Sequence, residues 1–198
     1  MRVIGITGRS GCGKSTVTRL YASLGCPCLD ADAVAREVLQ PGSPCIAQLQ
    51  NAFGSDIVEA DGTLRRRLLA DRAFATKEGA ARLTAITHPE ILRRIAAWIE
   101  ETRRTGAALA FVDGAVIVGT PFEAQCDDIL LITAPYEQSV ARICARDGIE
   151  PAMARRRLDA QTPEAALRKA ARWVLENDST PARLEEKARA LLPQMGRA

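Results

Sequence analysis

A lysine and a serine follow a glycine-rich turn close to the start of this sequence. The run Gly8–Ser15 (GRSGCGKS) matches the phosphate-binding pattern G-x-x-x-x-G-K-[ST] at every fixed position. Glycine adopts backbone angles that side chains forbid, so the amides of such a turn can point inward and bind phosphate oxygens. Lys14 would place a cation on the β- and γ-phosphates, and Ser15 would offer a hydroxyl to the magnesium ion that accompanies a nucleotide.

The segments on either side of this turn agree with that chemistry. The apolar run Val3–Thr7 predicts a buried strand, and Ser15–Leu24 predicts a helix, which is the context the motif requires. An incidental lysine in a glycine-rich turn is the alternative, but only four of the 27 basic residues are lysines. We therefore predict an ATP site with Mg²⁺ held at Ser15. Its binding residues are Gly11, Cys12, Gly13, Lys14, Ser15 and Thr16.

Two aspartates follow the next predicted strand, which is the short run Cys28–Leu29. In an open α/β sheet, polar residues at the carboxyl end of a strand lie over the ligand crevice. Asp30 and Asp32 are therefore candidates for accepting a proton from an attacking hydroxyl. Helix capping is the alternative, because Ala33–Leu39 has a helical pattern and aspartate is a good N-cap. One aspartate can cap while the other acts as base, and we assign the base to Asp32.

Composition and charge exclude several classes of protein. The 198 residues suit one domain with an inserted unit, and a net charge of +3 gives no reason to expect a nucleic-acid partner. No apolar run reaches the length of a membrane helix, and a strand starting near Met1 leaves no room for a signal peptide. Six cysteines without a C-x-x-C spacing are typical of reduced thiols, so we expect a cytoplasmic protein. Cys12 could be reactive at a helix N-terminus, but we favour a loop that needs a small residue.

A long helical stretch separates the second strand from the third. After Pro41–Pro44 breaks the chain, Cys45–Arg104 is mainly helical, with a turn at Glu59–Thr63. This is more than a crossover needs, so we expect a helical insertion that binds the acceptor substrate. Its one histidine, His88, is by itself expected to be structural. The cluster Arg65–Arg67 is expected to be a solvated helix face.

The second half of the chain supplies further strands and an arginine-rich segment. Strands are predicted at 107–112, 129–133 and 173–175, and a last helix at 181–192. Asp113 ends the first of these strands and would touch the magnesium or the acceptor. Arg142 and Arg146 are four residues apart and share a helix face. Arginines stabilise charge on a transferred phosphoryl group, so Arg142–Gln161 predicts a mobile lid, with a solvated helix pair as the alternative.

Together these features predict an α/β fold of the P-loop NTPase type, with three layers and a central parallel sheet. Residues 1–40 and 105–198 would form the nucleotide-binding core, with a lid at about 142–165, and residues 41–104 the helical insertion. This organisation is typical of a small-molecule kinase related to the nucleoside monophosphate kinases. The sequence contains no N-K-x-D guanine motif, and Asp113-Gly114 lacks the acidic pair of a motor ATPase.

Over nearly its whole length the chain resembles the dephospho-CoA kinase family. The matching residues are Gly5–Gly8, Gly13–Thr16, Asp30–Asp32, Ala35-Arg36, Pro41–Pro44, Asp61–Leu64, Arg66, Leu69, Phe74, His88-Pro89, Arg146–Gly148, Ala160-Gln161, Val174 and Asn177. The resemblance implies transfer of a phosphoryl group from ATP to the ribose 3′-hydroxyl of dephospho-coenzyme A, the last step of coenzyme A synthesis. It implies ATP, Mg²⁺ and dephospho-coenzyme A as partners, and leaves the oligomeric state open.

The resemblance also implies roles for individual residues. Asp32 matches the base, while Lys14, Arg142 and Arg146 match the clamp on the phosphates. Thr7, His88 and Asp113 would line the acceptor site together with Asp32, and Asn177 would lie by the adenine of ATP. The helical insertion corresponds to the coenzyme-binding domain of the family.

The chain departs from the family pattern at a few positions. The family follows its third-strand aspartate with a residue and then Pro-Leu-Leu, whereas this chain has Gly114–Gly119; Arg9 stands where a second loop glycine is usual. Two rival functions remain open from the residues alone. One is a kinase of another small hydroxyl acceptor, and the other is a nucleotide-binding relative without catalysis. Retention of Lys14, Asp32 and the arginines argues against the second.

Overall fold

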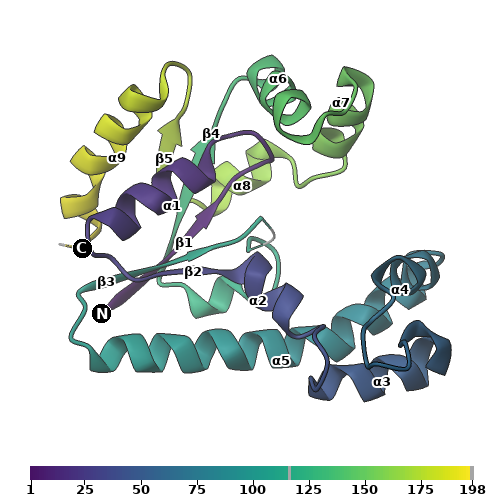
Figure 1. Cartoon of the computed structure of the whole chain (residues 1–198). Coiled ribbons are helices and arrows are strands. Elements are labelled where there is room, and N and C mark those ends of the chain that lie inside the picture. The colour runs from purple at the N-terminus through teal and green to yellow at the C-terminus, as the bar shows by residue number, and fades with distance from the viewer. Residues whose placement is uncertain (116, 197–198) are drawn as a thin grey trace. The chain divides into compact units, whose positions relative to one another are not determined.

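The computed structural model describes residues 1–115 and 117–196, and the chain divides into two compact units (Figure 1). Unit 1 comprises Met1–Asp30 and Ile99–Ala198, and unit 2 comprises Ala31–Trp98. The Pro-Gly break and the end of the helical pattern had placed the insertion at 41–104. The observed unit 2 begins earlier, at Ala31. It ends at Trp98, which lies inside the long helix Lys77–Arg104.

Unit 1 is built on a five-stranded sheet in which every pairing is parallel. The strand order is β2-β3-β1-β4-β5. The strands are β1 (Arg2–Thr7), β2 (Cys28–Asp30), β3 (Leu109–Asp113), β4 (Asp128–Thr133) and β5 (Trp173–Glu176). The interiors of β1, β3 and β4 are buried apolar runs, as expected for a parallel sheet covered on both faces. The predicted α/β class with a central parallel sheet is confirmed.

Helices α1 (Lys14–Ser23) and α9 (Pro181–Met195) pack side by side on one face of this sheet (Figure 1). Tyr21 of α1 stacks on Phe111 of β3 with ring centroids 4.6 Å apart, and its hydroxyl donates to the Ala188 carbonyl at 3.1 Å. These buried contacts fix the helix that follows the glycine-rich turn against the sheet. The predicted final helix is present and continues through Pro193 to Met195.

The remaining helices of unit 1 follow β4. Helices α6 (Tyr136–Asp147) and α7 (Pro151–Asp159) share a small core of Val140, Ile143, Ala154 and Leu158. Gly148, with φ +64°, ends α6. Helix α8 (Glu164–Ala170) was not expected from the sequence, and a 3-10 turn, η2, covers Glu123–Gln125.

Unit 2 is helical. It contains α2 (Ala31–Glu37), α3 (Pro44–Phe53), the 3-10 turn η1 (Ser55–Ile57), α4 (Arg66–Ala73) and α5 (Lys77–Arg104) as far as Trp98. The Ser43 hydroxyl caps α3 by accepting from the Cys45 amide at 3.3 Å. Helix α2 begins directly after β2, two residues before the predicted start. Among the described residues, none of the helices combines the length and the apolar character needed to cross a bilayer.

Candidate functional site

Three glycines of the phosphate loop (8–15) have backbone angles in the left-handed region. Gly8, Gly11 and Gly13 have φ of +153°, +76° and +101°. A Cβ on Gly11 would lie 2.6 Å from the Ser139 carbonyl, and one on Gly13 would lie 2.5 Å from the Asn177 amide. The loop therefore needs glycine for its conformation and for the close packing behind it. It leads directly into the N-terminus of α1, where free amides favour an anion.

Cys12 lies in the middle of this loop and is buried, with 3% of its surface exposed. Burial raises the pKa of its thiol to about 11, although Lys14 acts in the opposite direction. A neutral thiol is a poor nucleophile. This agrees with the interpretation that the loop needs a small residue here, and it argues against a reactive cysteine.

Lys14 and Asp113 meet at the carboxyl ends of β1 and β3. The Lys14 ammonium is 3.2 Å from Oδ1 of Asp113, and the Thr18 hydroxyl donates to Oδ2 at 2.8 Å. Oδ1 accepts no hydrogen bond in the described part of the chain, so its contact with Lys14 is an ion pair of imperfect geometry. Phosphate oxygens arriving at the loop would compete with Asp113 for the ammonium group. The sequence reasoning missed Thr18, although it lies one helical turn after Lys14.

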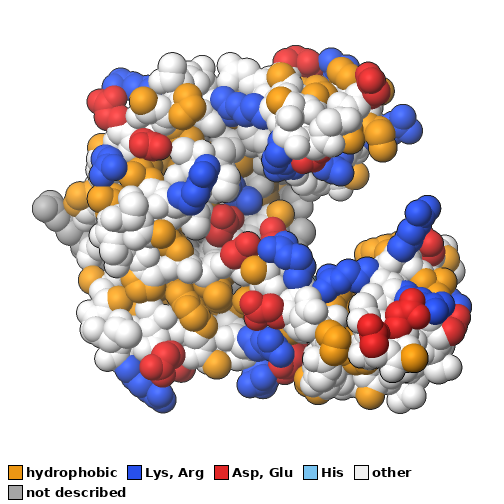
Figure 2. Space-filling view, viewed as in Figure 1, with side chains coloured by type: hydrophobic (Ala, Val, Ile, Leu, Met, Phe, Trp, Pro, Cys, Tyr) orange, Lys and Arg blue, Asp and Glu red, His pale blue; other side chains and the backbone are white. Residues whose placement is uncertain are grey.

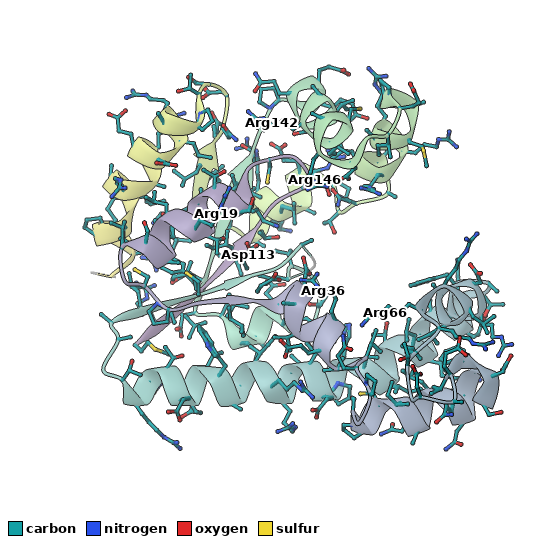
Figure 3. All side chains as sticks on the ribbon, viewed as in Figure 1. Arg19, Arg36, Arg66, Asp113, Arg142 and Arg146 are labelled. Carbon is teal, nitrogen blue, oxygen red and sulfur yellow. The ribbon has the colours of Figure 1, made fainter. Side chains whose placement is uncertain are left out.

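Asn177 and Arg142 hold the phosphate loop from behind. The buried Asn177 side chain donates to the Cys12 carbonyl at 2.8 Å. Arg142 donates to the Gly11 carbonyl at 3.2 Å and reaches the Asn177 side-chain oxygen at 3.5 Å (Figure 3). Both side chains therefore fix the outer side of the loop backbone. Asn177 was predicted to lie beside the adenine of ATP, and its hydrogen bond to the phosphate loop was not predicted.

Arg146 has different partners from Arg142, although both lie on α6. Its guanidinium pairs with the adjacent Asp147 at 2.6 and 2.9 Å, and Arg157 of α7 contacts the same carboxylate. These two arginines lower the pKa of Asp147 to about 2. The two arginines predicted to act together thus have different contacts, because Arg142 bonds to the phosphate loop and Arg146 to Asp147 at the end of α6.

The first half of the phosphate loop contacts the end of α7. The Ser10 amide donates to the Gln161 side-chain oxygen at 2.9 Å, and the Gln161 amide group donates to the Ser10 hydroxyl at 2.8 Å. Arg9 donates to the Leu158 carbonyl, and its guanidinium lies 5.8 Å from the centre of the Tyr136 ring. Gln161 was predicted only as the end of the lid, and its contact with Ser10 was not predicted, since nothing in a linear pattern connects the two residues.

Three neighbouring strands present polar residues at the same edge of the sheet. Asp30 of β2 lies opposite Asp113 of β3 in the strand register, and Thr7 ends the adjacent β1. The Thr7 hydroxyl is fully buried and has no hydrogen-bond partner among the described residues. Buried polar atoms of this kind occur at functional sites. The register thus places Asp30 opposite Asp113, and Thr7 one residue beyond Ile6, the partner of Asp113 in β1.

The two other predicted acceptor residues lie in unit 2. Asp32 is the second residue of α2 and is half-buried. His88 lies within α5, immediately before Pro89, and burial lowers the pKa of its imidazole. Burial thus favours the neutral ring, in which one nitrogen donates a hydrogen bond and the other accepts one.

The residues at this edge suit a magnesium ion that arrives with a nucleotide. In the described part of the chain, no three His, Cys, Asp or Glu side chains gather as a metal-binding group. Ser15 in the first turn of α1 and Asp113 supply hard oxygen donors. Mg²⁺ typically takes one or two protein oxygens together with phosphate and water, so this donor set fits.

Comparison with known proteins gives a consistent result. The family model "Dephospho-CoA kinase" matches residues 2–183. A Corynebacterium diphtheriae protein named dephospho-CoA kinase is 37% identical over 191 residues, which cover 96% of both chains. A Thermus thermophilus protein of solved structure is 36% identical with a TM-score of 0.82, covering 98% of this chain and 97% of its own. The dephospho-CoA kinase structure from Campylobacter jejuni has 22% identity and a TM-score of 0.67, covering 100% and 98%, which shows a shared fold.

The family model covers most of the chain, and the relative named above matches nearly its full length. The phosphate loop, the parallel sheet and the polar strand ends agree with a kinase that uses ATP. This chain therefore belongs to the dephospho-CoA kinase family.

Proposed function

We propose that this chain carries out its family's reaction with the phosphate loop as its ATP site and Asp32 as its base. The reaction is the ATP-dependent phosphorylation of dephospho-coenzyme A, the last step of coenzyme A biosynthesis. The observation that carries the proposal is the phosphate loop. Its three glycines have left-handed angles, and Asn177 and Arg142 hold its carbonyls outward.

The reaction needs a base that removes the proton of the attacking hydroxyl and cations that stabilise charge on the transferred phosphoryl group. The 3′-oxygen of the acceptor forms a bond to the γ-phosphorus, the bond from that phosphorus to the bridging oxygen breaks, and its electron pair leaves with ADP. The 3′-hydroxyl proton passes to the Asp32 carboxylate. Lys14 and Arg142 stabilise negative charge on the phosphoryl oxygens. Ser15 and Asp113 would hold Mg²⁺, which would supply further positive charge to the phosphates.

Unit 2 is the proposed acceptor unit. Asp32 and His88 belong to it, whereas Thr7 and Asp113 stand at the strand ends of unit 1. The neutral His88 ring would donate or accept a hydrogen bond with the acceptor. All six cysteines are free thiols, which agrees with a cytoplasmic enzyme. In the altered run after Asp113, Val116 lies outside the described residues.

The proposed lid is the segment at about 142–165, which contains the second half of α6 and all of α7. Arg142 and Arg146 would meet phosphate oxygens from one helix face, which requires Arg146 to leave Asp147. The contacts of Arg9 and Ser10 link the end of α7 to the phosphate loop, so loop and lid would respond together. We expect ATP to slow trypsin cleavage between residues 146 and 161. Equal cleavage with and without ATP would argue for a static helix pair.

Product formation tests the proposal directly. The purified chain is incubated with ATP, Mg²⁺ and dephospho-coenzyme A, with adenosine and shikimate as control acceptors, and products are identified by mass. We expect one added phosphoryl group on dephospho-coenzyme A and none on shikimate. ATP binding without phosphorylation of any acceptor would contradict the proposed roles.

A further inference from the structure

Four arginines of unit 2 form ion pairs with carboxylates of the same unit. Arg65 pairs with Glu59, and Arg72 pairs with Asp56. Arg93 and Arg94 both pair with Glu90. Because these charges are neutralised within unit 2, they are poor candidates for an external anion.

Arg66 differs from these arginines. It is exposed, and among the described residues its hydrogen bond goes to a neutral oxygen, the Arg36 carbonyl, at 3.1 Å. The residues that the structure describes place no carboxylate within ion-pair distance of it. This single bond uses one of the five N–H donors of a guanidinium. Most of the hydrogen-bonding capacity of Arg66 is thus available to a ligand.

The contact with Arg36 brings two arginines together. Arg36 lies in the last turn of α2, and Arg66 is the first residue of α4. Figure 3 labels the two residues near each other in unit 2, and Figure 2 shows basic side chains on the exposed surface of the same view. The hydrogen bond places the Arg66 guanidinium at the backbone of Arg36, and guanidinium groups suit the oxygens of a phosphate or diphosphate.

The position of Asp32 relates this pair to the proposed acceptor. Asp32 and Arg36 are four residues apart on α2, so they share a helix face and are separated by about 6 Å along the axis. In dephospho-coenzyme A, the 3′-hydroxyl and the 5′-diphosphate lie on opposite sides of one ribose, at a comparable spacing. A hydroxyl placed at Asp32 therefore directs the diphosphate toward Arg36 and Arg66.

We propose that Arg36 and Arg66 form the subsite for the 5′-diphosphate of the acceptor. The inference rests on the proposed function, because it takes Asp32 as the base. It revises the expectation that Arg65–Arg67 is only a solvated helix face. A purely structural Arg66 would serve to cap the end of α2 through the Arg36 carbonyl. The two roles are separable, because capping needs one N–H donor and no charge.

The test compares Arg66→Gln, Arg36→Gln and the control Arg67→Gln. Glutamine keeps an N–H donor but removes the charge, and Arg67 is the next exposed arginine of α4. Dissociation constants of dephospho-coenzyme A and adenosine are measured by calorimetry, and KM values for dephospho-coenzyme A and ATP by steady-state kinetics. We expect Arg66→Gln and Arg36→Gln to weaken the binding of dephospho-coenzyme A about ten- to hundredfold. This is the loss of affinity that a missing charge-assisted hydrogen bond predicts. Adenosine affinity and KM for ATP should stay within about twofold.

Three results would overturn the subsite. The first is an unchanged affinity for dephospho-coenzyme A in Arg66→Gln and Arg36→Gln. The second is an equal loss of adenosine affinity in these variants, and the third is the same loss of dephospho-coenzyme A affinity in Arg67→Gln. Thermal melting of each variant checks that it folds, and Arg66→Lys serves as a second variant that keeps the charge and should retain much of the affinity. The binding measurement needs no turnover. Failure of the wild type to transfer phosphate would therefore defeat the proposed function without deciding the subsite.

Discussion

At the phosphate loop, some side chains are proposed to contact the nucleotide and others shape the backbone. Asn177 and Arg142 donate to the carbonyls of Cys12 and Gly11. Because the peptide group is planar, a carbonyl held on the outer side turns the next amide inward. Asn177 and Arg142 thus orient the loop amides that are proposed to bind ATP, and Arg142 does so in addition to its proposed contact with the phosphates. This interpretation gives Asn177 a positioning role in addition to its proposed place near adenine.

Replacing the proposed base should reduce turnover selectively. We expect Asp32→Asn to lower kcat by about a hundredfold or more, because general base catalysis contributes on that order. The KM for ATP should hardly change, since Asp32 is not part of the phosphate loop. Steady-state kinetics with both substrates measures this. The matched control is Asp30→Asn, two residues earlier; an equal loss in the control, or normal turnover in Asp32→Asn, would contradict the assignment.

Burial of Cys12 should make stability depend on pH in the alkaline range. Its pKa is raised from 9.0 to about 11, so the folded state keeps a proton that the unfolded chain loses. Stability from this group is complete below pH 9 and falls as pH rises toward 11, by up to about 3 kcal/mol. Urea unfolding of the wild type and Cys12→Ala at pH 8 and pH 10.5 measures the effect. The variant should lose less stability between the two values, and equal losses would argue against a buried neutral thiol.

Local elements set the geometry of the ATP site through their ends. β1 ends at Thr7, the phosphate loop follows, and α1 begins at Lys14. Helix α6 contributes Arg142 from the other side of the loop. The amides at the start of α1 and the loop amides therefore converge on one place, where an anion is favoured.

Substitutions of the glycines before and after α1 distinguish the effect of backbone strain from that of close packing. Gly13 and Gly25 both have left-handed angles, +101° and +83°, but only Gly13 has neighbours where a Cβ would lie. We expect Gly25→Ala to lose about 1 kcal/mol of stability and to keep its KM for ATP. Gly13→Ala should lose ATP binding, since the new Cβ displaces Asn177. Calorimetric titration with ATP and urea unfolding measure both; similar ATP affinity in the two variants would contradict this account.

At the scale of the whole molecule, the chain is divided between two units joined through β2–α2 and through α5. The proposed ATP residues belong to unit 1, while Asp32, His88, Arg36 and Arg66 belong to unit 2. A reaction between two bound substrates gains rate when both are held in place. The division predicts that binding of each substrate can be removed separately.

Thermal shifts should reveal this separation. A ligand at a hundred times its Kd stabilises the folded state by about 2.7 kcal/mol, or roughly 5–10 °C in Tm for a chain of this size. We expect Lys14→Ala to lose the shift caused by ATP and to keep that caused by dephospho-coenzyme A. Arg66→Gln should keep the shift caused by ATP and reduce that caused by dephospho-coenzyme A to about half or less. Calorimetric scans at matched ligand concentrations measure both, and loss of both shifts in either variant would contradict separate binding units.

Features that depend on local pattern could be predicted from the amino-acid sequence. The strands are apolar runs bounded by polar or turn residues, and the structure places all five within about two residues of their predicted ends. The phosphate loop was recognisable because its glycines, Lys14 and Ser15 must stand at fixed spacing. The family was visible from motifs such as Asp30–Asp32 and His88-Pro89, and the family model confirms it.

Tertiary structure decided the relations between residues that are far apart in the chain. The contacts of Ser10 with Gln161, Cys12 with Asn177 and Lys14 with Asp113 join positions that share no local pattern. Helix α8 was not predicted, because its seven residues form too few turns for a clear hydrophobic periodicity. The order β2-β3-β1-β4-β5 likewise depends on strand pairing across the sheet. Local sequence propensity determines where helices and strands form. The packing of these elements determines which of their side chains are in contact.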